Sequence, residues 1–279
     1  MKFFIFPVSY PYGGYMCRIL FAVGSGYEIE KLLDAFVLSS KDDPYKAKRH
    51  SGNQHGDGWG YILLKNGIIE HYRSMTPIFQ DESVHKLKDK LSGFTVFMAH
   101  SRAASQGDKN LFNVQPFGFS SRRGFSFWFL HNGDLNKEKI IDIAELDIRQ
   151  LKKASDSFVA AVYLCRFLKG TAEENLLVMF RDLKKTVNTA LNTATLMIDP
   201  QGKIKAFITA YMVKKLANIQ SEWNYYRLLK LRKQNLFAIA SSTFEFYSNE
   251  PFKAVENGEA FYIDIAFGEE SFEVKNLKI

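Results

Sequence analysis

Cysteine is scarce in this sequence of 279 residues, which contains two, Cys17 and Cys165. Cys17 precedes an apolar, strand-like run, whereas Cys165 lies in an apolar run that indicates a buried helix. Small buried cysteines are common in such helices. Two cysteines in such different settings do not indicate a disulfide framework, so we expect a reducing, cytoplasmic environment.

Long hydrophobic segments are also missing. No segment is long and uncharged enough to cross a bilayer, so we expect no membrane association. The apolar residues 1–8 are interrupted by Pro7, and no small-residue cleavage site of a signal peptide follows them. Because the composition shows no linker and no internal repeat, we expect one domain.

Motifs for cofactors are absent as well. The glycine-rich segment 56–60 lacks the Lys-Ser/Thr pair of a phosphate-binding loop, which disfavours nucleotide binding. The histidines, of which His50, His55, His100 and His131 are the most interesting, match no common metal-ligand spacing. We expect them to be structural, and we expect neither a metal nor a cofactor.

The chain is basic, with 37 Lys and Arg against 30 Asp and Glu and a formal net charge of +7. The densest basic runs, Lys46–Arg49 and Lys230–Lys233, are short and resemble a loop and a hairpin turn. No zinc-finger spacing, basic helix or RNA-binding aromatic signature accompanies them. We therefore expect solvated surface charge and no nucleic-acid partner.

The expected elements run from strands to helices and back to strands. Residues 29–37 repeat at helical spacing, and Asn66-Gly67 between two apolar runs predicts a type I′ hairpin. A long polar loop is expected over residues 42–58. Further helices are expected over residues 82–91, 137–151, 156–168 and 172–189, and strands over 94–99, 125–130, 194–198, 204–208, 225–231, 236–240 and 260–265. Hairpins without repeated βαβ units indicate an α+β architecture of antiparallel sheets covered by helices.

Cys17 lies close to the start of the chain. A cysteine at a chain terminus carries both a thiol and a free α-amine, whose ordinary pKa of about 8 lets it accept the thiol proton. The chemistry of Cys17 therefore depends on whether it becomes the first residue. Met16 is either the true start, removed as usual before a small residue, or the end of a cleaved propeptide.

Several motifs are weak alone and informative together. Asn132-Gly133 after a strand, for example, would be read as a turn if it stood alone. The ordered motifs are Cys17-Arg18-Ile19-Leu20, Asp57-Gly58-Trp59-Gly60, His100-Ser101-Arg102-Ala103-Ala104-Ser105 with Gly107, Asn113-Val114-Gln115-Pro116-Phe117, His131-Asn132-Gly133, Ser155-Asp156-Ser157 and, more loosely, Ala240-Ser241 and Glu256-Asn257-Gly258-Glu259. In this order the chain resembles the class II glutamine amidotransferases, and it is closest to the stand-alone members without a fused synthetase.

The resemblance implies a fold and a domain. The fold is α+β, a four-layer αββα N-terminal-nucleophile hydrolase sandwich of antiparallel sheets. The domain spans residues 17–279, and residues 1–16 are a leader or a mis-assigned start that is missing from the mature protein.

The resemblance also implies roles for single residues. Cys17 is the nucleophile, and its own α-amine is the base. The Asn132 side chain and the Gly133 backbone N–H form the oxyanion hole. Arg102 binds the α-carboxylate of the substrate, with a surface ion pair as its plainer alternative. Asp156 binds the α-ammonium group, and it or Ser155 also caps a helix.

Asp57 and Trp59 are expected to shape the loop near the site without a chemical role. Two positions depart from the family pattern. Gln115 stands where a histidine usually precedes Pro116, and His55 precedes Gly56 where the stand-alone branch usually has a shorter turn.

Three functions follow from this reading. The first is a glutaminase or amidotransferase that forms a Cys17 thioester and releases ammonia to an acceptor held by another enzyme. The second is an amidohydrolase of a γ-glutamyl peptide or conjugate, which would use the same residues. The third is a catalytically silent binding protein, which retention of the whole residue set disfavours.

Overall fold

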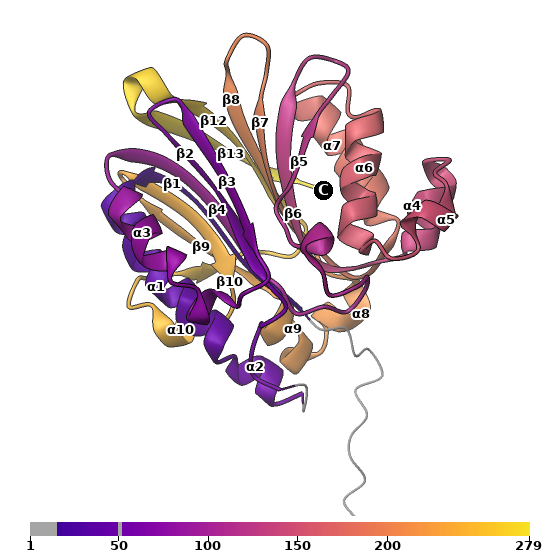
Figure 1. Ribbon diagram of the computed structural model, residues 1–279, viewed down its shortest axis with the longest axis horizontal. Helices are drawn as coiled ribbons and strands as arrows, with labels where there is room; N and C mark the ends of the chain where they lie inside the picture. Colours follow the sequence, from indigo (N-terminus) through magenta and orange to yellow (C-terminus); the bar gives the residue numbers. More distant parts are fainter. Residues whose placement is uncertain (1–15, 50–51) are drawn as a thin grey trace, which may run out of the picture.

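Two antiparallel β-sheets lie face to face, and helices cover the outer surface of each sheet (Figure 1). The structure is a computed structural model that describes residues 16–49 and 52–279. Helix, sheet, sheet and helix layers follow one another, as the α+β sandwich expected from the sequence requires.

The first sheet has seven strands in the order β11-β9-β10-β1-β4-β2-β3. Strand β1 lies at its centre and is antiparallel to both neighbours. The strands are β1 (Arg18–Ser25), β2 (Trp59–Lys65), β3 (Ile68–Ser74), β4 (Phe94–Ser101), β9 (Leu228–Lys233), β10 (Leu236–Ser241) and β11 (Lys253–Ala254). The hairpin between β2 and β3 turns at Asn66 and Gly67, whose φ angles of 50° and 73° suit the predicted type I′ turn.

The second sheet has six strands in the order β13-β12-β8-β7-β6-β5. They are β5 (Phe117–Ser120), β6 (Ser126–Leu135), β7 (Val187–Ile198), β8 (Ile204–Ala210), β12 (Glu259–Ala266) and β13 (Ser271–Lys278). Strand β6 of this sheet packs against β1 of the first sheet.

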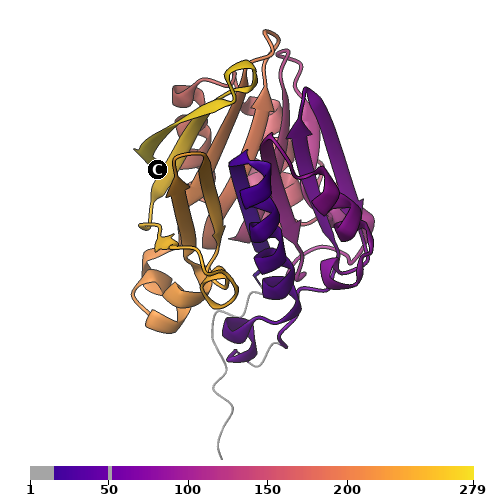
Figure 2. The same cartoon turned by 90° about the vertical axis from the view of Figure 1, so that its left-hand side faces the viewer.

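Helix α1 (Gly26–Lys41) runs along the outer face of the first sheet (Figure 2). It is accompanied on that side by α3 (Ser83–Lys90) and α10 (Phe244–Tyr247). The second sheet is covered by α6 (Asp156–Phe167) and α7 (Glu173–Lys184), with α4 (Lys137–Ile143) and α5 (Ile148–Leu151) beside them. Three short helices, α2 (Pro44–Ala47), α8 (Lys214–Ala217) and α9 (Gln220–Tyr226), lie at the end where β1 begins (Figure 1). The 3₁₀ helices are η1 (Ile78–Gln80), η2 (Leu111–Asn113) and η3 (Phe267–Glu269).

Strand β1 is buried on both faces because it lies between two layers. Leu20 and Ala22 pack toward α1, whereas Ile19, Phe21 and Val23 pack into the core between the sheets. Successive side chains of a strand point to opposite faces, so a strand covered on both sides is apolar throughout. This explains the continuous apolar run that follows Cys17.

Some predicted elements were wrong in extent. The helix expected over residues 137–151 is two short helices separated by a turn at Glu145, whose φ is 50°. The helix expected over residues 172–189 ends at Lys184, because the β-branched Val187 and Thr189 already belong to β7. The expected strand 225–231 starts only at Leu228, after α9.

The loop expected over residues 42–58 contains α2. Asp43 caps this helix, since its Oδ1 accepts the N–H groups of Tyr45 and Lys46 at 3.0 Å each. The expected strand 125–130 continues to Leu135, so the Asn132-Gly133 pair lies within β6. Among the helices of the described residues, none has the length and apolar character needed to cross a membrane.

Candidate active site

Cys17 lies directly before β1 and is partly buried. Arg18 pairs with Ser101 at the end of β4, so the chain ahead of Arg18 runs toward the residues that follow Ser101. The Cys17 Sγ accepts a hydrogen bond from the Ala103 N–H at 3.4 Å and donates one to the Ala103 carbonyl at 3.6 Å. The thiol is thus held against the segment that carries Arg102.

Burial raises the pKa of the Cys17 thiol to about 11, and Asp156 raises it further, while the Ala103 hydrogen bond and the charges of Arg102 and Lys46 lower it. These three charged side chains therefore lie close enough to Cys17 to act on it. With Met16 attached, the Cys17 nitrogen is an amide, and the thiol stays protonated at neutral pH.

Arg102 is 3% exposed, and its guanidinium donates to the carbonyls of Gln106 at 3.1 Å and Asp108 at 3.2 Å. It is therefore not the surface ion pair of the plainer reading. These bonds take two of the five N–H groups of arginine and fix the plane of the guanidinium. Asp57 supports the same segment, because its Oδ2 accepts the Ala104 N–H at 2.8 Å and its N–H donates to the Arg102 carbonyl at 3.0 Å.

Trp59, the other residue expected to shape this loop, is fully buried under the first sheet. Its Nε1 donates to the Asp81 carboxylate at 2.8 Å. Trp59 anchors the start of β2 on the side of the sheet that faces α1.

Asp156 is the first residue of α6 and is 3% exposed. Its Oδ2 accepts the Leu135 N–H at 2.8 Å, which ties the start of α6 to the end of β6. Ser155 caps the helix, since its Oγ accepts the Phe158 N–H at 3.2 Å. Burial raises the pKa of Asp156 to about 6.

A second carboxylate, Asp134, stands near Asp156 and was not singled out from the sequence. Burial and the Asp156 charge raise the pKa of Asp134. Two carboxylates that repel each other in a buried setting favour a cation between them. The only sequence signal for Asp134 is its position directly after Asn132-Gly133.

Asn132 lies on β6 and is 1% exposed, and among the described residues neither its Oδ1 nor its Nδ2 has a hydrogen-bond partner. An unpaired buried amide costs free energy, so this side chain suits a partner that arrives with a ligand. At Gly133 a Cβ atom would lie 2.0 Å from the Ala190 carbonyl oxygen on β7. Only glycine fits at this position, directly after Asn132.

His131 ties β6 to its surroundings, because its Nδ1 lies 2.9 Å from the Ser157 Oγ and its Nε2 lies 3.1 Å from the Ala190 carbonyl. Gln115, which replaces the usual histidine, accepts the His131 N–H at 2.7 Å and donates to the His131 carbonyl at 3.2 Å. Gln115 therefore holds the backbone just ahead of Asn132, a role that the sequence did not reveal.

Arg18 is completely buried and forms an ion pair with Asp43. His55 lies 2.8 Å from the same carboxylate, and the Arg18 Nη1 donates to the Cys17 carbonyl at 3.1 Å. Arg18 holds the pKa of Asp43 well below its usual range, with the His55 hydrogen bond acting in the same direction. Burial lowers the pKa of His55 to about 4, so this ring is neutral at pH 7. The three side chains lock the main chain at Cys17 to the loop that leads to Asp57.

Two residues of the first basic run are not at the solvated surface expected from the sequence, whereas Lys48 is exposed. Lys46 is 6% exposed and donates to the Gln54 carbonyl, and burial lowers its pKa. The Arg49 side chain is also largely buried and pairs with Glu222 at 2.6 Å. In the second run, Lys230 to Lys233 form part of strand β9 rather than a hairpin turn.

His55, His100 and His131 are all buried, as structural histidines should be, whereas His50 lies outside the described residues. Within residues 16–49 and 52–279, no group of three or more His, Cys, Asp and Glu side chains is arranged to hold a metal ion.

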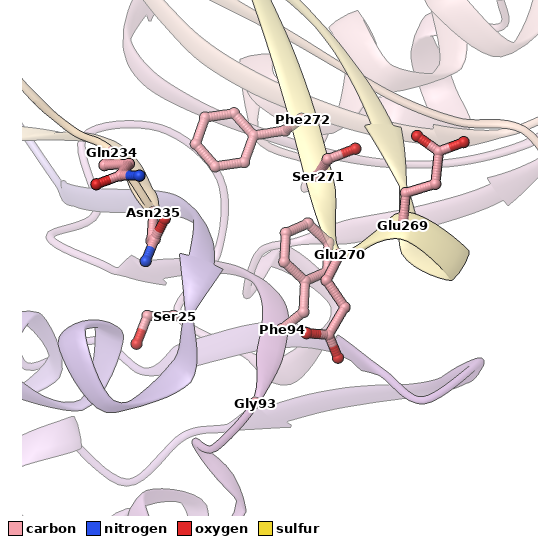
Figure 3. Close-up of a pocket in the computed structure, with 9 residues that line it drawn as sticks. All are labelled: Ser25, Gly93, Phe94, Gln234, Asn235, Glu269, Glu270, Ser271 and Phe272. Atoms are coloured by element: carbon pink, nitrogen blue, oxygen red, sulfur yellow. The ribbon is translucent and has the colours of Figure 1, made fainter.

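A cavity of about 570 Å³ lies elsewhere, at the opposite end of β1 (Figure 3). Ser25, the last residue of β1, lines it together with Asn235 and the carboxylate residues Glu269 and Glu270. It is separated from Cys17 by the whole length of the strand, about 25 Å at ~3.3 Å per residue. Its lining offers neither a cysteine nor a cationic side chain.

The helix-covered pair of antiparallel sheets is the sandwich of the N-terminal-nucleophile hydrolases. A structure of the allosteric regulatory enzyme of purine biosynthesis shares the fold, with a TM-score of 0.57 and 17% identity over 92% of this chain. Glutamine phosphoribosylpyrophosphate amidotransferase from B. subtilis, complexed with ADP and GMP, gives 0.56 and 16% over 92%. A glutamine aminotransferase class-II domain protein from Silicibacter pomeroyi gives 0.50 and 15%, covering 93% of this chain and 98% of its own. This chain spans about half of the first two structures, 48% of each. A search of curated proteins found no match.

The family model of class II glutamine amidotransferases matches residues 36–221, more than half of the sequence. The chain therefore belongs to the class II glutamine amidotransferases. The matched range contains Arg102, Asn132, Gly133 and Asp156 but begins after Cys17. Cys17 is linked to these residues by its place in the fold, through its hydrogen bonds to Ala103.

Proposed function

We propose that this chain hydrolyses the side-chain amide of glutamine through Cys17, after the bond between Met16 and Cys17 has been cut. Cutting converts the Cys17 amide nitrogen into an amine of ordinary pKa about 8, which accepts the thiol proton. The thiolate attacks the side-chain carbonyl, ammonia leaves with a proton from the amine, and water then releases glutamate from the thioester. The ammonia passes to an acceptor bound by another protein.

The other residues of the site have roles in this reaction. Asn132 and the Gly133 N–H would donate to the oxygen of the tetrahedral intermediate, which fits a side-chain amide that has no partner among residues 16–49 and 52–279. Arg102 would bind the α-carboxylate through its remaining N–H groups. Asp156, with Asp134 beside it, would bind the α-ammonium group.

The observation that carries the proposal is that the Cys17 thiol is hydrogen-bonded to Ala103, directly after the buried Arg102, and that the opposite charges of Arg102 and Asp156 both influence its pKa. An amino-acid head group needs this pair of charges, and the reacting amide must then reach the sulfur. A surface ion pair or a helix cap alone would not require both charges to lie near a cysteine.

The test begins with protein whose intact mass shows Cys17 as the first residue. We expect it to release glutamate and ammonia from glutamine, and Cys17→Ala to abolish this release. Cys165→Ala is the matched control and should retain full activity. Cys165 lies near the end of α6, at the opposite end of the helix from Asp156. A diazo-ketone analogue of glutamine should label Cys17 in the same protein. Absence of both turnover and label would favour the silent binding protein and reject the proposal.

A further inference from the structure

Met16 occupies an apolar pocket. It is 1% exposed and packs in a buried cluster whose other members are Ala190, Met212, Leu216, Tyr225 and Tyr226. Its N–H donates to the Tyr225 hydroxyl at 2.9 Å. A methionine held in this way shows that the pocket accepts an unbranched apolar chain.

The pocket is a fixed part of the fold. Asn257 holds Met212 through two hydrogen bonds, accepting its N–H at 2.8 Å and donating to its carbonyl at 3.0 Å. Ala190 is held from the other side of the pocket, because its carbonyl oxygen lies 3.1 Å from the His131 Nε2. The walls are therefore fixed by contacts that do not involve Met16.

The pocket adjoins both Cys17 and the candidate oxyanion hole. It borders Cys17 through the bond that joins Met16 to it. It also borders the candidate oxyanion hole, since the Ala190 carbonyl is the atom that a Cβ at Gly133 would strike. A substrate bound at Cys17 and Gly133 would thus have this pocket beside it.

The proposed reaction indicates which part of the substrate would enter the Met16 pocket. The leaving nitrogen takes its proton from the Cys17 α-amine, so the two nitrogens must come within hydrogen-bond reach. That amine is the atom to which the Met16 carbonyl was attached. A substituent on the leaving nitrogen would therefore extend to where the Met16 side chain lies.

We propose that removal of Met16 opens this pocket for an apolar substituent on the leaving nitrogen, which makes γ-glutamyl amides of unbranched apolar amines the preferred substrates. The inference rests on the proposed function. A bond forms between the Cys17 sulfur and the γ-glutamyl carbonyl carbon, the carbon–nitrogen bond breaks, and the amine leaves with the proton from the thiol. Water then hydrolyses the thioester to glutamate and restores the thiol.

The test compares glutamine with γ-glutamyl methyl-, ethyl-, propyl- and butylamide, using protein whose mass shows Cys17 as the first residue. Burial of each methylene should raise kcat/KM roughly fourfold, until the chain reaches the length of the methionine side chain. The series needs only the unsubstituted protein, so it does not depend on the folding of a variant.

A variant locates the effect in this pocket. Leu216→Phe places a larger side chain in the cluster and should lower the ratio of kcat/KM for butylamide over glutamine about tenfold. Leu38→Phe is the matched control, because the same exchange is made on the exposed side of α1, where Leu38 is 45% exposed. It should leave the ratio unchanged.

The outcomes separate the two proposals. If glutamine is hydrolysed and kcat/KM stays level or falls along the amide series, the pocket inference is overturned and the proposed function stands. If neither glutamine nor any amide is hydrolysed, both are overturned. A rising series that Leu216→Phe abolishes and Leu38→Phe preserves supports the inference.

Discussion

At the residue scale, the proposed function makes the reactivity of Cys17 depend on the nitrogen of its own main chain. While Met16 is attached, that nitrogen is an amide and cannot accept a proton. Burial raises the thiol pKa to about 11. The Ala103 hydrogen bond and the Arg102 charge lower this pKa, but by less than burial raises it. The uncut chain therefore holds a protonated, poorly nucleophilic sulfur.

Alkylation kinetics test this control. In protein that retains Met16, the rate of Cys17 alkylation by iodoacetamide should rise about tenfold per pH unit from pH 7 toward pH 11, because only the thiolate reacts. Measurement by mass spectrometry on a Cys165→Ala background removes the second thiol. Protein that begins with Cys17 should already react near pH 8. A rate that levels off below pH 9 in the uncut protein would contradict the expectation.

Asn132 is a second residue of interest, because its buried side-chain amide has no hydrogen-bond partner among the described residues. Asn132→Ala removes one donor to the developing oxyanion and should lower kcat for glutamine about 100- to 1000-fold with a smaller change in KM. Asn136→Ala makes the same exchange at the cap of α4, where the side chain accepts the Lys139 N–H at 2.9 Å. That control should cost about 1 kcal/mol of stability and leave kcat unchanged. Equal kcat values for the two variants would remove Asn132 from the mechanism.

At the element scale, β1 matters because it delivers Cys17 to the end of β4. Its first residue, Arg18, is buried in a core where an unpaired charge would be very costly. Asp43 supplies the compensating charge, and the Ser241 hydroxyl accepts the Ile19 N–H at 2.9 Å. The position of the nucleophile thus depends on α2 and on β10 as well as on β1.

Breaking the buried pair should have a large effect. Asp43→Asn leaves the Arg18 charge without its partner and should lower the free energy of unfolding by about 3 kcal/mol. Asp34→Asn is the control, because the Asp34 carboxylate pairs with Lys88 on the surface and is 57% exposed. Urea unfolding should detect only a small change for it. If both variants lose the same stability, the buried pair does not fix the start of β1.

The sequence predicted elements well where local chemistry decides. Asn66-Gly67 requires a tight turn, and Asp156 to Phe167 form the expected helix after a serine cap. It could not predict the contacts of Asp43, because these join residues 25 and 12 positions apart. Lys46 was wrongly expected at the surface for the same reason. A basic run has no local feature that tells a solvated lysine from one buried beside a thiol.

The candidate site shows the same contrast between residues that local motifs reveal and residues whose roles depend on distant partners. The ordered motifs were enough to select Cys17, Arg102 and Asp156, and the charges of Arg102 and Asp156 both influence the pKa of Cys17. Asp134 and Gln115 were missed as contributors because their roles depend on partners in other strands and helices. The pocket of Met16 could not be predicted at all, since its walls come from β7, α8, α9 and the chain between them.

At the scale of the whole molecule, three buried histidines couple stability to pH. Burial lowers the pKa of His55 and of His131 to about 4 and that of His100 well below its ordinary value. In the unfolded chain these rings have pKa values of about 6.5, so they take up protons there first as the pH falls. Asp156 acts in the opposite direction, because its pKa of about 6 makes the folded state bind its proton first.

This difference in proton binding between the folded and unfolded states predicts how the free energy of unfolding depends on pH. Between about pH 6 and pH 4 the unfolded state binds up to three more protons on the histidines, and fewer protons on Asp156 and Asp134, a net excess of about one to two. The free energy of unfolding should therefore fall by about 1.5 to 2.5 kcal/mol for each pH unit of acidification in this range. Urea unfolding at pH 6.0, 5.5 and 5.0 measures the slope. His55→Asn should reduce it by about 1.4 kcal/mol per unit, whereas His85→Asn, which replaces an exposed histidine, should not change it. An unchanged slope in His55→Asn would mean that this ring is protonated in the folded protein, beside the Asp43 carboxylate.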